Sequence, residues 1–157
     1  MSEDLARGLS FLHENGIVHL DIKPHNMVYD ERFNLYLIDF GASEKVEGVQ
    51  STIDEVRGTE LWMAPGLFTE VKKGPYSPIL ADCFSCGCIF EQINSYLGNK
   101  QLAEFTKKLQ TKCPSDRLDA HRAAFRVSVG HLRLWSARRK SLAQLPDVLS
   151  CPLKVEG

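Results

Sequence analysis

The sequence has little that would direct the protein to a membrane or to a polyanion. Its 157 residues carry a formal net charge of −1 at pH 7, which gives no global attraction to nucleic acid or to an anionic lipid surface. The first residues are acidic and contain neither a basic region nor a long apolar stretch, so no signal peptide and no transmembrane span are expected. We therefore predict an intracellular, cytoplasmic protein without nucleic-acid or membrane partners.

The cysteines also lack the paired spacing of a secreted disulfide framework. There are five of them, at Cys83, Cys86, Cys88, Cys113 and Cys151, and reduced thiols are the expectation. The first three could suggest a metal site, but cysteines spaced three and then two residues apart on one helix cannot surround a metal ion tetrahedrally. Buried small hydrophobic side chains are the favoured interpretation.

Charge divides the chain into two zones, while composition as a whole is that of an ordinary globular protein, 43% hydrophobic and 25% charged. Residues 1–120 hold 12 Lys and Arg against 18 Asp and Glu, whereas residues 121–157 hold 7 against 2. We interpret 1–120 as a domain and 121–157 as an unassigned basic tail. The basic cluster at 133–140 could touch a membrane or a partner, but a solvated helix face or extension is favoured because Pro146 and Pro152 break its continuity.

Hydrophobic periodicity predicts a mainly α domain with one small β-hairpin. Apolar residues at helical spacing indicate helices, and two short β-type runs around a polar turn are typical of a hairpin. A long polar connection at 42–60 is of the kind that is functional or mobile in a compact domain. The predicted elements are a helix from Leu5 to near Gly16, strands at 27–29 and 35–38, a buried helix at 79–97 and an amphipathic helix at about 102–112.

Two polar segments flank the hairpin and carry the residues of most chemical interest. Residues 19–26 read His-Leu-Asp-Ile-Lys-Pro-His-Asn, and residues 39–41 read Asp-Phe-Gly. Phosphoryl transfer needs a carboxylate near the acceptor hydroxyl, a carboxylate and a neutral ligand on Mg²⁺, and a cation on the transferring phosphate. One residue of each kind is present, namely Asp21, Asp39, Asn26 and Lys23.

This pattern resembles the catalytic loop and Asp-Phe-Gly motif of eukaryotic-type serine/threonine protein kinases. Three further segments follow in the family's order. Residues 58–65 resemble the end of the activation segment, residues 82–87 the start of the buried helix that anchors the catalytic loop, and residues 114–118 the turn before the last helices of the large lobe. The resemblance covers residues 5–120 and implies a protein kinase-like fold.

The resemblance also implies a role for each site residue. Asp21 is expected to orient the substrate hydroxyl as catalytic base, and Lys23 to steady the γ-phosphate of ATP. Asn26 and Asp39 are expected to hold Mg²⁺, and Val28 to contact the nucleotide. His19 and Phe40 are expected to pack together as a structural spine. The implied function is ATP-dependent transfer of a phosphoryl group to a Ser or Thr hydroxyl of a protein substrate.

Parts of the family pattern are missing from the sequence. It contains no G-x-G-x-x-G loop and no Val-Ala-Ile-Lys strand, so we expect the large (C-terminal) lobe only and a chain that is weakly active or inactive by itself. Two explanations stay open: a fragment or mis-bounded product of a longer kinase gene, or a degenerate kinase-like protein. In the second case the chain would be a non-catalytic binding or scaffold module for a partner protein.

Two substitutions bear on regulation and stability. Leu20 stands where most regulated kinases carry Arg, so a phosphate on the activation segment would lack its usual guanidinium partner. Gly66 stands where the family has a Glu that pairs with the Arg seen here as Arg117. We therefore expect Gly66→Glu to stabilise the fold through a new ion pair with Arg117.

Overall fold

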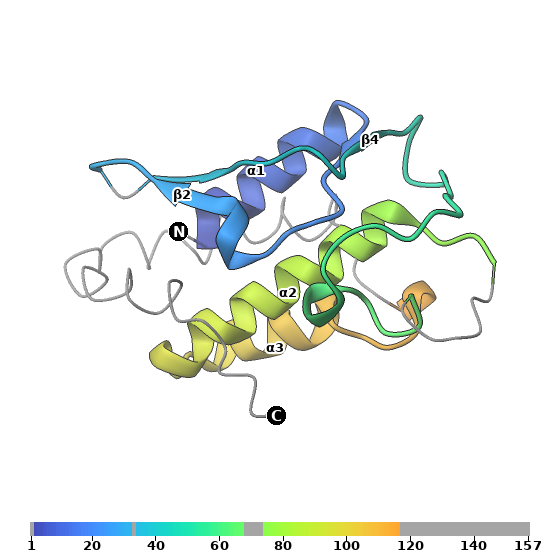
Figure 1. Cartoon of the computed structure of the whole chain (residues 1–157). Coiled ribbons are helices and arrows are strands. Elements are labelled where there is room, and N and C mark those ends of the chain that lie inside the picture. Colours follow the sequence, from blue (N-terminus) through green and yellow to red (C-terminus); the bar gives the residue numbers. More distant parts are fainter. Residues whose placement is uncertain (1, 33, 68–73, 117–157) are drawn as a thin grey trace, which may run out of the picture.

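The structure is a computed structural model that describes residues 2–32, 34–67 and 74–116. The predicted basic tail and Arg117 lie outside the described residues. In chain order the elements are α1 (Ser2–Glu14), β1 (Ile17–Val18), a 3₁₀ turn (Pro24–Asn26), β2 (Met27–Tyr29), β3 (Leu35–Leu37), β4 (Glu44–Lys45), a 3₁₀ turn (Glu60–Trp62), α2 (Pro78–Leu97), α3 (Lys100–Leu109) and a 3₁₀ turn (Pro114–Asp116). In Figure 1, α1 lies above α2, α3 lies along α2, and the hairpin containing β2 stands beside them.

The helix predicted from Leu5 is confirmed as α1, and its apolar positions face the interior. Leu5, Leu9 and Leu12 are buried, as expected for an amphipathic helix with its apolar side on the core. The chain then turns at Gly16, which has φ 69°. A Cβ on Gly16 would lie 2.5 Å from the Val46 carbonyl oxygen, so both the backbone conformation and the close approach require glycine here.

The buried helix predicted at 79–97 is confirmed as α2. The Ser77 hydroxyl caps its first turn by accepting from the Leu80 amide at 3.4 Å, Pro78 occupies the first turn, and Gly98 ends the helix in the left-handed conformation. Within the helix, Gly87 allows α3 to come close. A Cβ there would lie 2.9 Å from Gln110 Cγ and 3.0 Å from Leu109 Cβ.

The bounds expected for the last helix were wrong by two or three residues at each end. α3 begins at Lys100 because the Asn99 side chain accepts from the Leu102 amide at 3.0 Å and so caps the first turn. It ends at Leu109, since Gln110 leaves helical geometry with ψ 13°.

The hairpin is confirmed, and a second strand pair was not predicted. β2 and β3 pair antiparallel with Met27 opposite Leu37 and Val28 opposite Tyr36. β1 pairs antiparallel with β4, which lies inside the connection 42–60 that the sequence indicated only as a long polar segment. A pair of two-residue strands with no alternating apolar pattern gives no period-two signal.

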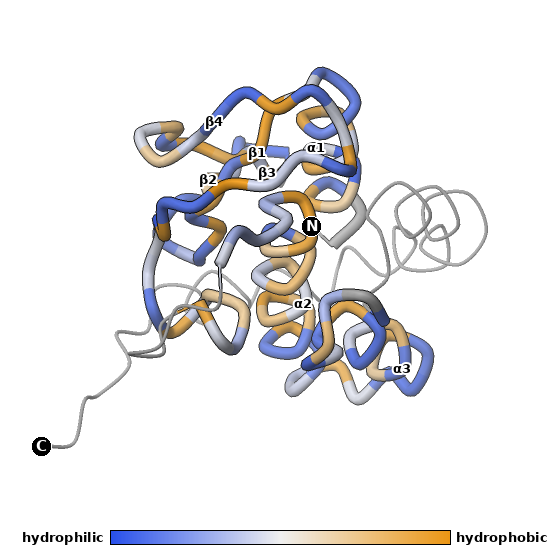
Figure 2. Tube along the Cα trace, turned by 90° about the vertical axis from the view of Figure 1, so that its right-hand side faces the viewer, coloured by the Kyte–Doolittle hydropathy of each residue, from blue (hydrophilic) through white to orange (hydrophobic). Residues whose placement is uncertain are grey.

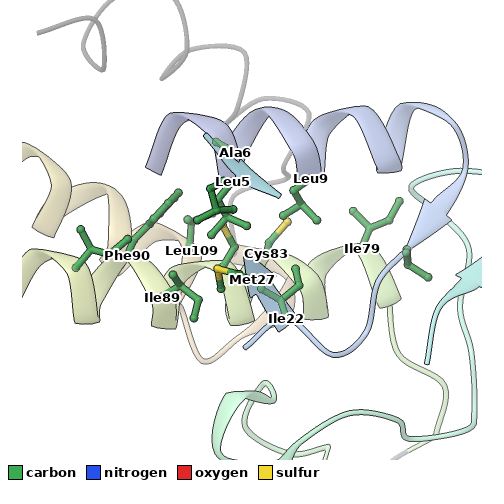
Figure 3. Packing of buried hydrophobic residues seen from close by; sticks show 14 of the residues in the cluster. Leu5, Ala6, Leu9, Ile22, Met27, Ile79, Cys83, Ile89, Phe90 and Leu109 are labelled. Carbon is green, nitrogen blue, oxygen red and sulfur yellow. The ribbon is translucent and has the colours of Figure 1, made fainter. Parts of the chain in front are cut away.

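The core forms around α2 (Figures 2 and 3). Side chains from α1 point toward α2, and Figure 3 shows Leu5 and Leu9 facing Cys83 and Ile79 of that helix. Cys83 and Cys86 are buried, and burial raises the pKa of the Cys86 thiol well above its ordinary value of 9.0. The described cysteines form no disulfide, and the described His, Cys, Asp and Glu residues include no group of three arranged to hold a metal. The interpretation as small buried side chains is confirmed for Cys83 and Cys86 and was wrong for Cys88, which is only partly buried.

None of the helices in the described ranges combines the length and apolarity that a membrane crossing needs.

Candidate active site

Residues 19–26, which we call the catalytic loop, are anchored from below by a fully buried carboxylate of α2. Asp82 Oδ2 accepts from the His19 amide at 2.8 Å, and Oδ1 accepts from the Leu20 amide at 2.7 Å. Leu20 has φ 66°, a left-handed conformation that costs an L-residue about 1–2 kcal/mol. The two hydrogen bonds to Asp82 hold this strained turn, so α2 determines the path of the loop.

His19 joins the catalytic loop to the Asp-Phe-Gly segment. The Asp21 amide donates to His19 Nδ1 at 3.4 Å, which leaves Nε2 to carry the proton and donate to the Ile38 carbonyl at 3.2 Å. The His19 ring also packs against Phe40, with ring centroids 5.0 Å apart and planes tilted by 51°. The predicted packing of these two residues is therefore confirmed.

Asp21 and Lys23, both predicted site residues, meet in one hydrogen-bonded network. Lys23 Nζ lies 2.8 Å from Asp21 Oδ2, and Asn26 Nδ2 donates to the same oxygen at 3.0 Å and to the Asp21 carbonyl at 2.9 Å. The Thr59 hydroxyl donates to Asp21 Oδ1 at 2.7 Å and accepts from Lys23 Nζ at 2.8 Å. Three polar side chains thus fix the position of a single carboxylate.

The network also determines the charge of Asp21. Burial raises the pKa of this carboxyl, but hydrogen bonds from Lys23 and Thr59, the charge of Lys23 and the Asn26 amide outweigh it and leave the pKa below its ordinary value of 3.8. Asp21 is therefore ionised at neutral pH. A carboxylate with a lowered pKa is suited to accept a hydrogen bond from a substrate hydroxyl and orient it.

The hairpin brings together the chain segments that carry the two predicted metal ligands. The Ile38 amide donates to the Asn26 carbonyl at 3.0 Å, one step beyond the pair Met27 and Leu37, so Asp39 follows the residue that lies opposite Asn26. Asp39 has φ 63°, and its Oδ1 accepts from the Gly41 amide at 3.2 Å.

The donor atoms at this corner fit Mg²⁺. Because Asn26 Nδ2 is engaged with Asp21, its Oδ1 is the atom of that amide left to face a cation. Asp39 is exposed and adds a carboxylate. One carboxylate and one amide oxygen match the small number of hard oxygen ligands that proteins give Mg²⁺ when phosphates complete its shell.

Val28 lies on an exposed apolar face of the hairpin. Val28 and Tyr36 are opposite one another in the β2–β3 pair, and Ile38 is two residues farther along the same side; all three are exposed. Contiguous apolar side chains on a surface mark a binding face. The nucleotide contact predicted for Val28 would be made on this face.

The connection from Asp39 to Gly66, which we call the activation segment, returns to the catalytic loop at Gly58. This residue has φ 110°, and a Cβ there would lie 2.3 Å from the Leu20 carbonyl oxygen. Farther on, the Ser85 hydroxyl of α2 donates to the Trp62 carbonyl at 2.7 Å. From the sequence, Thr59 was only part of the segment 58–65 that resembles the end of the activation segment. Its contact with Asp21 depends on this return of the chain, which no local pattern encodes.

Gly66 corrects one expectation. It has φ 92°, in the region that L side chains rarely adopt, so Gly66→Glu is strained although nothing lies within 4 Å of a Cβ at this position. The expected stabilisation by this substitution is therefore withdrawn. The partner that we had assigned to the new carboxylate, Arg117, lies outside the described residues.

Comparison with known proteins identifies the family. The sequence model of the protein kinase domain matches residues 1–111, and the described helices and small sheets fit part of such a fold. The chain belongs to the protein kinase family.

Individual relatives give the same result. The chain is 32% identical over 114 residues to the serine/threonine-protein kinase RUNKEL of Arabidopsis thaliana, covering 71% of this chain and 8% of the relative. It is 36% identical over 92 residues to mitogen-activated protein kinase kinase kinase A of Dictyostelium discoideum, covering 59% and 9%. It is 39% identical over 87 residues to the MAP kinase kinase MKK1/SSP32 of Saccharomyces cerevisiae, covering 55% and 16%. The matched region thus spans less than a fifth of each of these relatives.

Proposed function

We propose that residues 1–120 form the large lobe of an ATP-dependent serine/threonine protein kinase and present its catalytic residues. The observation that carries the proposal is the Asp21 carboxylate held by Lys23, Asn26 and Thr59 beside the corner that contains Asp39. A fixed anionic acceptor, a cation and two oxygen ligands are the groups that phosphoryl transfer requires.

Each residue then has a distinct task. Asp21, ionised and hydrogen-bonded, accepts the hydrogen bond of a Ser or Thr hydroxyl and aligns its oxygen for attack on the γ-phosphorus. Lys23 lies against Asp21 at 2.8 Å and places its ammonium where the transferring phosphoryl group gains negative charge. Asn26 and Asp39 would hold Mg²⁺, which would supply positive charge to offset the negative charge of the phosphates.

The exposed apolar face of the hairpin suits the nucleotide base. Val28 and Ile38 are both exposed there, and covering them with an aromatic ring would remove apolar surface from water. The 157 residues include no glycine-rich loop. The proposal therefore requires a small lobe, from another segment or another protein, to enclose the phosphates, and by itself the 157-residue chain should transfer no phosphate above background.

Nucleotide binding tests the proposal. We would measure a fluorescent ATP analogue with and without Mg²⁺ on the 157-residue chain and on a fusion carrying a kinase small lobe ahead of Met1. We expect Mg²⁺-dependent affinity in the fusion, its loss in Asp39→Asn, and retained binding without phosphoryl transfer in Asp21→Asn. Glu104→Gln, which neutralises an exposed carboxylate on α3, is the control and should change neither.

Two outcomes would contradict parts of this scheme. A correctly folded fusion without nucleotide affinity would overturn the assignment of Asn26 and Asp39, and would favour the alternative of a non-catalytic module that binds a partner protein. Robust transfer by the chain alone that disappears in Asp21→Asn would show that no further lobe is needed.

A further inference from the structure

Arg57 joins two carboxylates of the activation segment. Its Nη1 lies 3.3 Å from Glu44 Oε2, and its Nη2 donates to Glu55 Oε2 at 2.6 Å. Glu44 belongs to β4 and lies opposite Val18 of β1, directly before the catalytic loop. The guanidinium therefore connects the distal part of the activation segment to the strand pair from which the catalytic loop starts.

The same stretch is fastened from its other side by Tyr76. Ile53 and Tyr76 exchange two backbone hydrogen bonds of 3.0 Å, and the Tyr76 hydroxyl donates to the Glu55 carbonyl at 3.1 Å. Residues 53–57 are thus held between the entry to α2 and β4. In Figure 1 this part of the chain is the green trace that runs between β4 and α2 on the right of the molecule.

The two residues that follow Arg57 in the chain contact the catalytic loop. Arg57 precedes Gly58, whose backbone touches Leu20, and Thr59, which bonds to Asp21 and Lys23. Leu20 is apolar, so the position directly before Asp21 offers no cation to a phosphorylated segment. Arg57, which belongs to the activation segment, is the cation that contacts Glu44 and Glu55 of the same segment.

We propose that Arg57 is a positioning residue that clasps the activation segment to β4 through Glu44 and Glu55, and so keeps Thr59 on Asp21 without phosphorylation. The planar guanidinium directs one nitrogen toward each carboxylate in a rigid fork, whereas a lysine would have to reach both from a single nitrogen on a flexible stem. The ordering of the activation segment by Arg57 does not depend on any catalytic activity. Its effect on phosphoryl transfer rests on the proposed function.

Hydrogen–deuterium exchange read by mass spectrometry tests the clasp on the 157-residue chain, made in bacteria and verified as unphosphorylated by its intact mass. In Arg57→Ala we expect peptides within 48–62 to exchange about fivefold faster, the factor expected from losing two partly exposed ion pairs. Arg57→Lys should recover only part of the protection. Arg32→Ala, which removes an exposed arginine in the β2–β3 turn, is the matched control and should leave these peptides unchanged.

Salt and a double-mutant cycle separate the clasp from a general loss of packing. The side chains of Arg57 and Glu44 are 29% and 36% exposed, so 1 M salt should abolish most of the difference between the parent and Arg57→Ala. Glu44→Gln should add little once Arg57 is Ala. The proposal is overturned if exchange in 48–62 is equal in the parent and Arg57→Ala, if the difference persists in 1 M salt, or if faster exchange extends to α1 and α2. Neither readout uses ATP, so failure of the clasp proposal can be distinguished from failure of nucleotide binding.

Discussion

The buried carboxylate of Asp82 offers the sharpest test of how the catalytic loop is built. Asp82 accepts three hydrogen bonds: from the His19 amide at 2.8 Å, from the Leu20 amide at 2.7 Å and from His13 Nε2 at 2.9 Å. Asp82→Asn keeps the volume but replaces one oxygen by an NH₂ group. Whichever way the amide turns, its NH₂ group faces a backbone donor, and at least one N–H loses its acceptor.

The magnitude follows from these contacts. A hydrogen bond to a charged group contributes about 1.5–3 kcal/mol, and a buried donor left without a partner costs about 1–3 kcal/mol. The neutral amide is less costly to bury than a carboxylate, which offsets part of this loss. We therefore expect Asp82→Asn to lower the free energy of unfolding by about 3 kcal/mol, a large fraction of the roughly 5–15 kcal/mol typical of a domain.

Urea unfolding followed by circular dichroism measures this difference. Glu104→Gln on the surface of α3 is the matched neutralisation and should change the free energy of unfolding by less than about 0.5 kcal/mol. Hydrogen exchange at His19 and Leu20 should accelerate in Asp82→Asn beyond the global effect, because these amides lose their acceptor. A loss below about 1 kcal/mol, or unchanged exchange at both amides, would refute the anchoring role of Asp82.

Three further predictions concern single positions. Gly66→Ala and Gly66→Glu should each destabilise by about 1 kcal/mol in urea unfolding, because both add a Cβ at φ 92°; stabilisation by Glu alone would revive the withdrawn ion pair. The pKa of Asp21 is below 3.8 in the folded chain, so its contribution to stability is present above pH 3.8 and is lost as the pH falls through the lowered pKa. The difference in unfolding free energy between the parent and Asp21→Asn should therefore shrink on acidification, and a constant difference would contradict this. Gly87→Ala should destabilise the fold by about 1–3 kcal/mol, because the added methyl group would contact residues at the end of α3. Gly8→Ala, where nothing lies within 4 Å of a Cβ, should instead stabilise it by about 0.5–1 kcal/mol. Equal effects of the two substitutions in thermal unfolding would refute the close approach of α3.

Elements with their own periodic pattern could be predicted from the sequence. The apolar spacing of α1, the long hydrophobic run of α2 and the paired β runs each reflect a face that the element buries, so their existence and type were right. The predicted ends of α3 were wrong, because its start is decided by the capping bond that the Leu102 amide donates to the Asn99 side chain and not by local propensity. Pairing of β1 with β4 depends on contacts across 25 or more residues and leaves no local signal.

The candidate site divides in the same way. The motif spacing predicted one site for Asp21, Asn26 and Asp39; the structure shows Asn26 bonded to Asp21, and the short-range register of the hairpin brings the chain near Asp39 back toward Asn26. The left-handed turn at Leu20 could not be read from the sequence, since a leucine gives no indication of positive φ. Arg57 gave no signal either, because a single arginine in a polar connection has the same sequence pattern as any solvated surface residue.

The two attachments of the site differ in kind, and this difference bears on how the site responds to conditions. Asp82 is fully buried and shielded from salt, so the loop it holds stays fixed until the domain unfolds, whereas the Arg57 clasp is partly exposed and weakens with ionic strength. Burial raises the pKa of Asp21, and hydrogen bonds from Lys23 and Thr59 lower it. If the clasp releases Thr59, one of the contacts that lower the pKa of Asp21 is removed while the loop remains in place, so this pKa should rise. The partly exposed Arg57 would thus act on the pKa of the candidate catalytic base through Thr59.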